Sequence, residues 1–197
     1  MPMVIDNSSG HERAMDIWSM LLQKRIVFLQ GEVTEAGATA LIAQLVYLES
    51  VKQSESISMY INSPGGSVSA GLAIYDTMNY IASPVETLVI GQAASMASLL
   101  LCAGAPGGRS ALPNSRIMMH QPMGGTQGQA SDIAIQAEQI QRAKQRIIDI
   151  YAKHTRMHRD EIAHKIDRDF WLTPHEAMQH GLLDRVFDKR ETDAGWD

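Results

Sequence analysis

One serine of this chain, Ser95, lies where its backbone position alone could activate a nucleophile. It follows an apolar run at 88–90 that predicts a buried strand, and it precedes an apolar stretch at 96–102 that predicts a helix. A helix N-terminus offers free backbone N–H groups and the positive end of the helix dipole, which stabilise an attacking alkoxide and the oxyanion it creates. The alternative is a helix-capping serine, which is the commoner role for an isolated serine at this position.

A serine nucleophile also needs a base within hydrogen-bonding reach and a third group that orients the base. Of the seven histidines, His120 alone ends an apolar strand-like segment, and side chains at strand ends of α/β sheets commonly face the binding crevice. The other histidines lie in polar or helical segments, where we expect solvated surface positions. For the orienting group, the run from Asp167 to Trp171 offers two carboxylates, Asp167 and Asp169, beside bulky apolar residues that could bury one of them.

A candidate oxyanion hole accompanies these side chains. Gly65 and Gly66 lack a Cβ, so a ligand can approach their backbone N–H groups closely. The backbone N–H of Met96, directly after the candidate nucleophile, would be the second donor. An ordinary strand-to-helix turn at Pro64-Gly65-Gly66 is the alternative interpretation.

The elements that must position these residues alternate along the chain. We expect strands at 25–30, 57–62, 86–90, 116–120 and 182–187, and helices at 17–22, 32–51, 68–81, 96–102, 130–154 and 173–181. The first twenty residues are polar and are expected to form a mobile arm leading into the first short helix. Such alternation predicts an α/β fold around a mostly parallel sheet.

The expected helix at 130–154 is longer than a compact domain of this size requires, at roughly 37 Å. Its apolar stripe, which includes Ile133, Ile140, Ile147 and Tyr151, has the spacing of a core-facing helix. The helix could pack along its own domain, and a contact with another subunit is the interpretation that we favour.

Composition limits the classes of function. The chain has 197 residues, enough for one domain, and its net charge of −5 offers no basic surface for nucleic acid. No apolar run is long enough to span a bilayer, and the N-terminal residues do not resemble a secretory signal, so we expect a cytoplasmic protein. The single cysteine, Cys102, excludes an internal disulfide and is expected to be a reduced core thiol.

Four segments together resemble the ClpP family, the proteolytic subunits of the ATP-dependent Clp protease: 60–68 (YINSPGGSV), 91–96 (GQAASM), 112–122 (LPNSRIMMHQP) and 167–169 (DRD). The resemblance covers nearly the whole chain. It implies an α/β fold of the ClpP/crotonase-like type, with repeated ββα units in a spiral and a protruding handle made of a strand and a helix. It also implies one protease domain over 1–197: an axial N-terminal arm at 1–20, a head at 21–122, the handle at 123–157, and a segment at 158–197 that completes the head.

The same resemblance assigns roles to individual residues. Ser95 would be the nucleophile, His120 the general base and Asp169 the group that orients it, with the oxyanion hole formed by Gly66 and Met96. The remaining assignments are substrate backbone pairing by Gly124, Gly125 and Thr126, oligomer contacts by Asp167 and Arg168, and docking of the partner ATPase near Tyr60 and Tyr80.

The implied function is that of a serine endopeptidase that hydrolyses unfolded proteins inside a barrel of two stacked heptameric rings. The sequence contains no Gly-x-x-x-x-Gly-Lys-Ser/Thr phosphate loop, so a separate AAA+ unfoldase of the Clp type would supply the ATP dependence. No metal, other cofactor, nucleic acid or membrane is implied. Three alternatives are weaker: a crotonase-like acyl-CoA enzyme, a Ser–Lys peptidase, and a non-catalytic ring subunit. A catalytic subunit that works only beside a second isoform also stays open.

Overall fold

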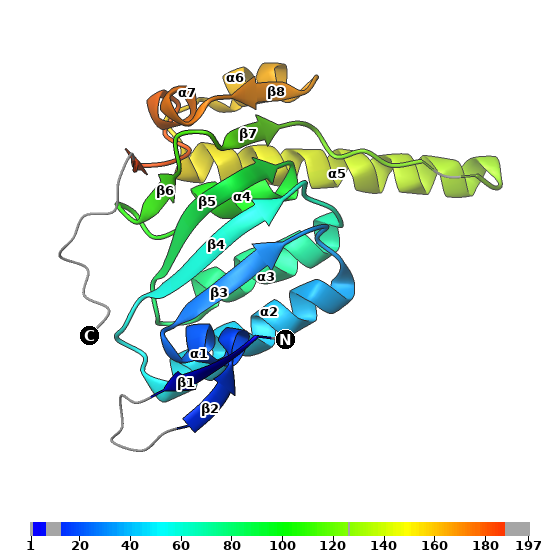
Figure 1. Cartoon of the computed structure of the whole chain (residues 1–197). Coiled ribbons are helices and arrows are strands. Elements are labelled where there is room, and N and C mark those ends of the chain that lie inside the picture. The colour runs from blue at the N-terminus through cyan, green and yellow to red at the C-terminus, as the bar shows by residue number, and fades with distance from the viewer. Residues whose placement is uncertain (1, 7–12, 126, 188–197) are drawn as a thin grey trace.

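Figure 1 shows the computed structural model, which describes residues 2–6, 13–125 and 127–187. Its centre is a seven-stranded sheet. Five strands pair in the order β3 (Ile26–Gln30), β4 (Ile57–Ser63), β5 (Val85–Ala94), β6 (Arg109–Ala111) and β9 (Arg185–Val186), all of them parallel. Two further strands branch from this path: β7 (Arg116–Met119) pairs parallel with the last residues of β5, and β8 (Phe170–Leu172) pairs antiparallel with β7.

Four helices lie side by side against one face of the sheet, behind it in Figure 1: α2 (Glu35–Val51), α3 (Val68–Tyr80), α4 (Met96–Cys102) and α5 (Ala130–His154). The residues of β4 show how this layer forms. Ile57, Met59 and Ile61 are fully buried, whereas the alternate residues are at most half-buried, as expected for a strand with one covered face. The core therefore lies between the sheet and this helical layer.

The remaining elements lie at the ends of the chain. Helix α1 (Ile17–Gln23) follows an antiparallel hairpin of β1 (Met3–Asp6) and β2 (Arg13–Asp16), and helices α6 (Arg159–Lys165) and α7 (Pro174–Gln179) flank β8. A capping box at Thr173 and Glu176 starts α7, whose first residue is a proline.

The α/β alternation predicted from the sequence is confirmed, and helix α5 has the predicted bounds. The prediction was wrong at the N-terminus, where residues 3–6 and 13–16 pair as β1 and β2. The short elements β6, α6 and β8 were not predicted, because runs of three to seven residues are too short to show a period. The last strand contains only Arg185 and Val186 rather than residues 182–187.

Helix α5 has two different halves. Its C-terminal part packs into the core through Ile147, Ile148 and Tyr151, and its N-terminal part extends beyond the sheet in Figure 1. On that part Ile133 and Ile135 remain 42% and 55% exposed. The predicted core-facing stripe is thus buried only toward the C-terminus of the helix, and the other half leaves apolar surface uncovered.

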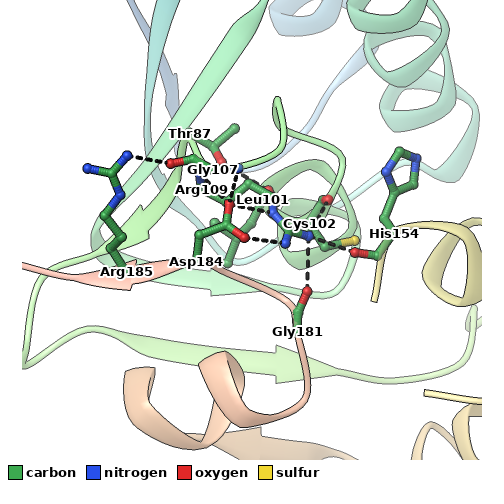
Figure 2. Close-up of polar contacts among 9 residues, drawn as sticks. All are labelled: Thr87, Leu101, Cys102, Gly107, Arg109, His154, Gly181, Asp184 and Arg185. Carbon is green, nitrogen blue, oxygen red and sulfur yellow. Dashed lines mark hydrogen bonds and ion pairs between the residues drawn. The ribbon is translucent and has the colours of Figure 1, made fainter. Parts of the chain in front are cut away.

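The C-terminal segment is fastened to the core by Arg109, shown in Figure 2. Its guanidinium donates to three carbonyl oxygens at the C-terminal ends of three helices: Cys102 of α4 at 3.2 Å, His154 of α5 at 2.6 Å and Gly181 after α7 at 3.0 Å. The same group forms an ion pair of 2.6 Å with Asp184. One cation therefore compensates the negative ends of three helix dipoles and joins segments that are distant in sequence.

Candidate active site

The sheet pairing brings Ser95, His120 and Asp169 to one place. Ala94 at the end of β5 pairs with Met118 of β7, and Met119 of β7 pairs with Phe170 of β8. Ser95 follows β5, His120 follows β7 and Asp169 precedes β8. Since β8 runs antiparallel to β7, the residue after one strand lies beside the residue before the other. The three side chains thus converge at one edge of the sheet.

Two contacts connect these side chains. The Nε2 atom of His120 lies 2.7 Å from Ser95 Oγ, and its Nδ1 atom lies 3.3 Å from Asp169 Oδ1. We assign the imidazole proton to Nδ1, so that it donates to the carboxylate while Nε2 accepts the serine proton. The expected burial of the orienting carboxylate is wrong, because the Asp169 side chain is 60% exposed while that of His120 is 13% exposed. Asp167, the other candidate, does not form this contact.

The backbone of Ser95 is strained. Its φ of 55° and ψ of −125° lie outside the regions that residues with a Cβ favour, at a cost on the order of 1–3 kcal/mol. Although Ser95 occupies the N-cap position of α4, its side chain caps no helical N–H. The helix-capping alternative is therefore wrong, and the side chain is directed to His120 instead. Strain of this kind is common where a reactive side chain must be presented at a turn.

The glycine turn packs directly against the Ser95 turn. Gly65 has a φ of +88°, and a Cβ on it would lie 2.6 Å from the Ala94 carbonyl oxygen and 3.0 Å from the Met96 nitrogen. Two hydrogen bonds join this turn to Val33: the Val33 N–H donates to the Gly65 carbonyl oxygen, and the Ser67 N–H donates to the Val33 carbonyl oxygen. The Gly66 N–H takes no part in this bridge. As the first residue of α4, Met96 has an N–H outside the helical ladder. The residue that packs against the Ser95 turn is thus Gly65, whereas a Cβ on the predicted donor Gly66 would meet Val33 and Glu32 instead.

A small pocket opens beside the serine and histidine. Its walls are apolar and come from α3, α4, α5 and the segment after β7: Val68, Met96, Leu99, Pro122, Ile147 and Tyr151 line it together with Ser95 and His120. Sequence reasoning did not identify this pocket. The spacing of Ile147 and Tyr151 four residues apart was recognised as one helix face, but nothing in the sequence shows that this face reaches the serine.

The three residues predicted to pair with substrate belong to the segment after β7. That segment runs along α5 in Figure 1, and a Cβ on Gly124 would lie 2.9 Å from the Ile140 side chain. Gly125 is exposed, and a Cβ on it would have no neighbouring atom within 4 Å. Thr126 lies outside the described residues. The described part of this segment forms no strand pairing within the chain.

The predicted oligomer-contact residues lie next to the catalytic candidates. Asp167 and Arg168 are both exposed, and with His120, Met123 and Asp169 they line a second, open pocket. Gln121 connects the two regions, because its Nε2 donates to the Asp167 carbonyl oxygen at 3.0 Å and its N–H donates to the Ile166 carbonyl oxygen. Any movement of the 167–168 segment would therefore reach the residue next to His120.

The two predicted docking tyrosines lie in different surroundings. Tyr60 on β4 packs edge-on against Phe28 at a ring-centroid distance of 5.5 Å, and Phe28 packs against Trp18 at 5.0 Å. Tyr80 is 87% exposed at the end of α3. Within the described part of the chain, no aromatic contact joins the two tyrosines.

Two described histidines, His154 and His180, are partly buried rather than fully solvated as predicted, and His11 lies outside the described residues. His154 at the end of α5 is half-buried, with Nε2 at 3.0 Å from the Tyr75 hydroxyl. Burial, together with the charges of Lys153 and Arg109, lowers the pKa of His154 to about 4, so its imidazole is neutral at pH 7. It contacts no member of the Ser95 site and is a packing residue of the α3–α5 contact.

Two further properties concern the residues that the structure describes. Among residues 2–6, 13–125 and 127–187, no group of three or more histidine, cysteine, aspartate or glutamate side chains is placed to hold a metal ion. In the same ranges no helix combines the length and the apolar character needed to cross a bilayer.

A comparison with known families completes this description. A family model described as Clp protease matches residues 9–190, which is most of the chain and includes every candidate site residue. Clp proteases are serine peptidases that self-associate and work with Clp ATPases. The chain therefore belongs to the Clp protease family and is a proteolytic subunit of the ClpP type.

Proposed function

We propose that Ser95, His120 and Asp169 are the catalytic residues of this peptidase. The observation that carries the proposal is the position of His120, whose two ring nitrogens contact Ser95 and Asp169 at 2.7 Å and 3.3 Å. This order of nucleophile, base and orienting carboxylate is one that catalyses acyl transfer in serine peptidases. Asp169 keeps the imidazole in the tautomer whose Nε2 is free to accept a proton.

In the first half of the reaction, Ser95 Oγ attacks the carbonyl carbon of the scissile peptide bond while His120 Nε2 takes the hydroxyl proton. The carbonyl oxygen becomes an oxyanion, which accepts hydrogen bonds from the N–H groups of Gly66 and Met96. When the tetrahedral intermediate collapses, the C–N bond breaks and His120 gives its proton to the leaving amine. The acyl group remains on Ser95.

In the second half, water replaces the amine. The water oxygen attacks the acyl carbon while His120 takes a proton from the water. A second oxyanion forms where the first one was, beside the N–H groups of Gly66 and Met96. Collapse breaks the bond to Ser95 Oγ, which recovers its proton from His120. The carboxylic acid product leaves and the resting site is restored. Every proton transfer in this scheme uses His120, and the scheme calls on no group from outside the chain other than water and substrate.

The proposed substrates are unfolded polypeptides bound through their main chain. Gly124 and Gly125 have no side chain to obstruct an added strand, and with Thr126 they would pair with substrate backbone in the manner of β-strand addition. Such pairing is independent of sequence. The apolar pocket beside Ser95 supports one preference, for an apolar residue immediately before the cleaved bond.

The proposed assembly is two stacked heptameric rings. The exposed isoleucines at 133 and 135 on the protruding half of α5 support a contact between the rings, because apolar surface on a protruding helix is stabilised by a partner. Asp167 and Arg168 are the proposed polar part of this contact. We further propose one protease domain, with an axial arm at 1–20, a head at 21–122 and 158–197, and the handle at 123–157.

An AAA+ unfoldase of the Clp type is the proposed source of unfolded substrate. The aromatic surface at Tyr60, Phe28 and Trp18 and the exposed ring of Tyr80 support docking of a partner through apolar side chains. We propose the cytoplasm as the compartment, where the buried thiol of Cys102 would stay reduced.

The experiment that tests the catalytic proposal is labelling with a fluorophosphonate probe, followed by intact and native mass measurement. Wild-type protein should gain one probe per subunit, on Ser95, within a large assembly. Ser95→Ala should assemble normally and take up no probe. Ser50→Ala, which removes an exposed hydroxyl at the end of α2, should label like wild type. Normal labelling or peptide cleavage by Ser95→Ala would overturn the proposal.

A further inference from the structure

Two buried hydroxyl groups beneath Ser95 have no part in the reaction scheme above. Ser98, on the first turn of α4, has no exposed surface, and Tyr151, on α5, is 1% exposed. Buried hydroxyls of this kind are costly unless they are hydrogen-bonded, so their partners are informative. Both contact the backbone that carries the nucleophile.

The contacts form a compact network. Ser98 Oγ lies 2.7 Å from the Ser95 carbonyl oxygen, 2.7 Å from the Met118 carbonyl oxygen and 2.7 Å from the Tyr151 hydroxyl. The Tyr151 hydroxyl is also 3.3 Å from the Ser95 carbonyl oxygen. The Met118 carbonyl in turn accepts the N–H of Ser95 at 2.8 Å. The N–H and the C=O of Ser95 are thus both connected to the same group of atoms.

The proton positions in this network follow from the number of donors. Carbonyl oxygens only accept, and each hydroxyl has one proton to donate. If Tyr151 donates to Ser98 Oγ, then Ser98 donates to a backbone carbonyl, and both protons are used at 2.7 Å. Burial raises the pKa of Tyr151, so its hydroxyl keeps its proton throughout the working pH range. In that arrangement the chain of donation runs from α5 through α4 to one of two backbone carbonyls, that of Ser95 or that of Met118, which itself accepts the Ser95 N–H.

The geometry of the peptide bond gives this network a role at the reacting atoms. The carbonyl of Ser95 and the N–H of Met96 belong to one planar peptide unit and point in opposite directions. A group that holds the Ser95 carbonyl therefore also fixes the direction of the Met96 N–H. Two helical N–H groups, of Ser98 and Leu99, hold the same carbonyl at 3.0 Å and 3.3 Å, and the Ser98 hydroxyl adds a shorter contact.

We propose that Ser98 and Tyr151 are positioning residues, which hold the strained Ser95–Met96 peptide so that the Met96 N–H points at the oxyanion. The inference rests on the proposed roles of Ser95 and Met96. Without the two hydroxyls the strained peptide can tilt, and the N–H then meets the oxyanion at a poorer angle. Because the oxyanion exists only in the transition state, the loss should appear in kcat and not in KM.

The position of Tyr151 extends the consequence to helix α5. The same helix has exposed isoleucines on its protruding half, and its packed half delivers the tyrosine hydroxyl to the nucleophile backbone. A shift of α5 along or about its axis would change the Tyr151–Ser98 contact directly, because Tyr151 belongs to that helix. The pair is thus a physical connection between the handle and the oxyanion hole.

The test uses full-length assembled protein and hydroxyl deletions that preserve shape. Tyr151→Phe keeps the ring that lines the pocket, and Ser98→Ala removes one atom from a site where it leaves no large cavity. The matched controls are Tyr75→Phe, which removes the hydroxyl bonded to His154, and Ser110→Ala, which removes a buried hydroxyl bonded to the Thr87 carbonyl. Native mass measurement and probe titration give the number of assembled, labelled sites for each variant.

We expect each deletion at Ser98 or Tyr151 to lower kcat by about tenfold with KM unchanged. Affinity for a peptide boronate, whose tetrahedral adduct on Ser95 places an oxygen in the oxyanion position, should fall by the same factor. The double variant should lose little more than either single one, because both act through one hydrogen-bonded unit. The two control variants should keep wild-type kcat and boronate affinity.

The inference is overturned if Ser98→Ala and Tyr151→Phe lower thermal stability yet keep wild-type kcat and boronate affinity per labelled site. If only one of the two variants assembles, the kcat of that variant alone decides whether the inference stands: a reduced kcat supports it and a wild-type kcat rejects it. Labelling of wild-type protein at a residue other than Ser95 would instead overturn the proposed function, and the inference with it. Wild-type labelling at Ser95 with unchanged variants rejects the inference alone.

Discussion

Gly65 and Ser95 approach each other so closely that a Cβ on the glycine would lie 2.7 Å from the Cβ of the serine. The glycine turn after β4 and the serine turn after β5 are therefore built against each other, and each limits the side chain that the other can carry. Strain at Ser95 is retained because this contact, the Met118 carbonyl and the start of α4 together determine its backbone.

The first prediction follows from that contact. Gly65→Ala should abolish probe labelling at Ser95, because the added methyl group would displace the Ser95 turn and because alanine disfavours a φ of +88°. Gly31→Ala is a matched control, since Gly31 has a φ of +73° but no atom within 4 Å of the new methyl group. It should lose about 1 kcal/mol of stability and keep its labelling. Equal labelling of both variants would contradict the prediction.

The second prediction concerns the orienting carboxylate. Asp169→Asn should lower kcat by about 10²–10³-fold, because the amide no longer favours the imidazole tautomer whose Nε2 accepts a proton. We expect a loss at the lower end of this range, since Asp169 is 60% exposed and its contact with His120 is 3.3 Å long. Asp76→Asn, at an exposed position on α3, is the control. Steady-state hydrolysis of a fluorogenic peptide measures both variants, and an unchanged kcat for Asp169→Asn would remove this residue from the mechanism.

The third prediction concerns the pocket beside the serine. Peptides with leucine or methionine before the cleaved bond should be hydrolysed at least about tenfold faster, in kcat/KM, than peptides with aspartate there, because the pocket walls are apolar. Val68→Phe, which places a larger side chain in the wall of this small pocket, should lower kcat/KM for leucine and methionine peptides relative to alanine peptides. A peptide library analysed by mass spectrometry measures the preference, and a profile unaltered by Val68→Phe would place the subsite elsewhere.

The fourth prediction concerns the fastening of the C-terminal segment. Partial burial raises the pKa of Asp184, but hydrogen bonds from the side chain and N–H of Arg109 and from the N–H of Gly107 outweigh this effect, and the net pKa lies below its ordinary value. The ionised carboxylate therefore stabilises the fold above the unfolded-state pKa of about 3.9, and this contribution disappears as the pH falls through the lower, folded value.

Asp184→Asn should accordingly lower the free energy of unfolding by about 2 kcal/mol at pH 7, because Arg109 would lose its ionic partner. The difference from wild type should begin to narrow below about pH 4 and be lost as the pH falls through the lower, folded-state pKa, where the wild-type carboxylate also becomes neutral. Glu138→Gln is the control, as it breaks an exposed pair with Arg142 and should cost less than about 0.5 kcal/mol. Urea unfolding at equal subunit concentration measures both, and a difference that is independent of pH would contradict the assignment.

The sequence was sufficient to predict the long, regular parts of the fold. Helix α5 shows its period over many turns, and β4 and β5 are apolar runs between turn residues, so their positions could be predicted within a few residues. The serine at the β5–α4 junction and the histidine after β7 could be identified for the same reason. A strand end followed by a polar residue is visible in the sequence without any knowledge of tertiary contacts.

The remaining parts of the site depend on contacts that no local pattern records. Strand β8 has only three residues, so its antiparallel pairing with β7 depends on tertiary contacts and cannot be read from the local sequence. This pairing brings Asp169, and not Asp167, into contact with the His120 ring. The apolar pocket and the Ser98–Tyr151 contact join α4 to α5 across 53 residues of sequence. Residues of this kind have ordinary packing periodicity, and their second role becomes visible only in three dimensions.

The late position of Asp169 has a consequence for how the subunit is made. A ribosome delivers the chain from the N-terminus, so Ser95 and His120 emerge before residue 169 of the 197. Strand β8 cannot pair with β7 until its residues have been synthesised, and Arg109 cannot form its ion pair before Asp184 has been added. A nascent subunit thus carries a serine and a histidine but no oriented base. The order of synthesis thus delays completion of the candidate triad until residue 169 has been made.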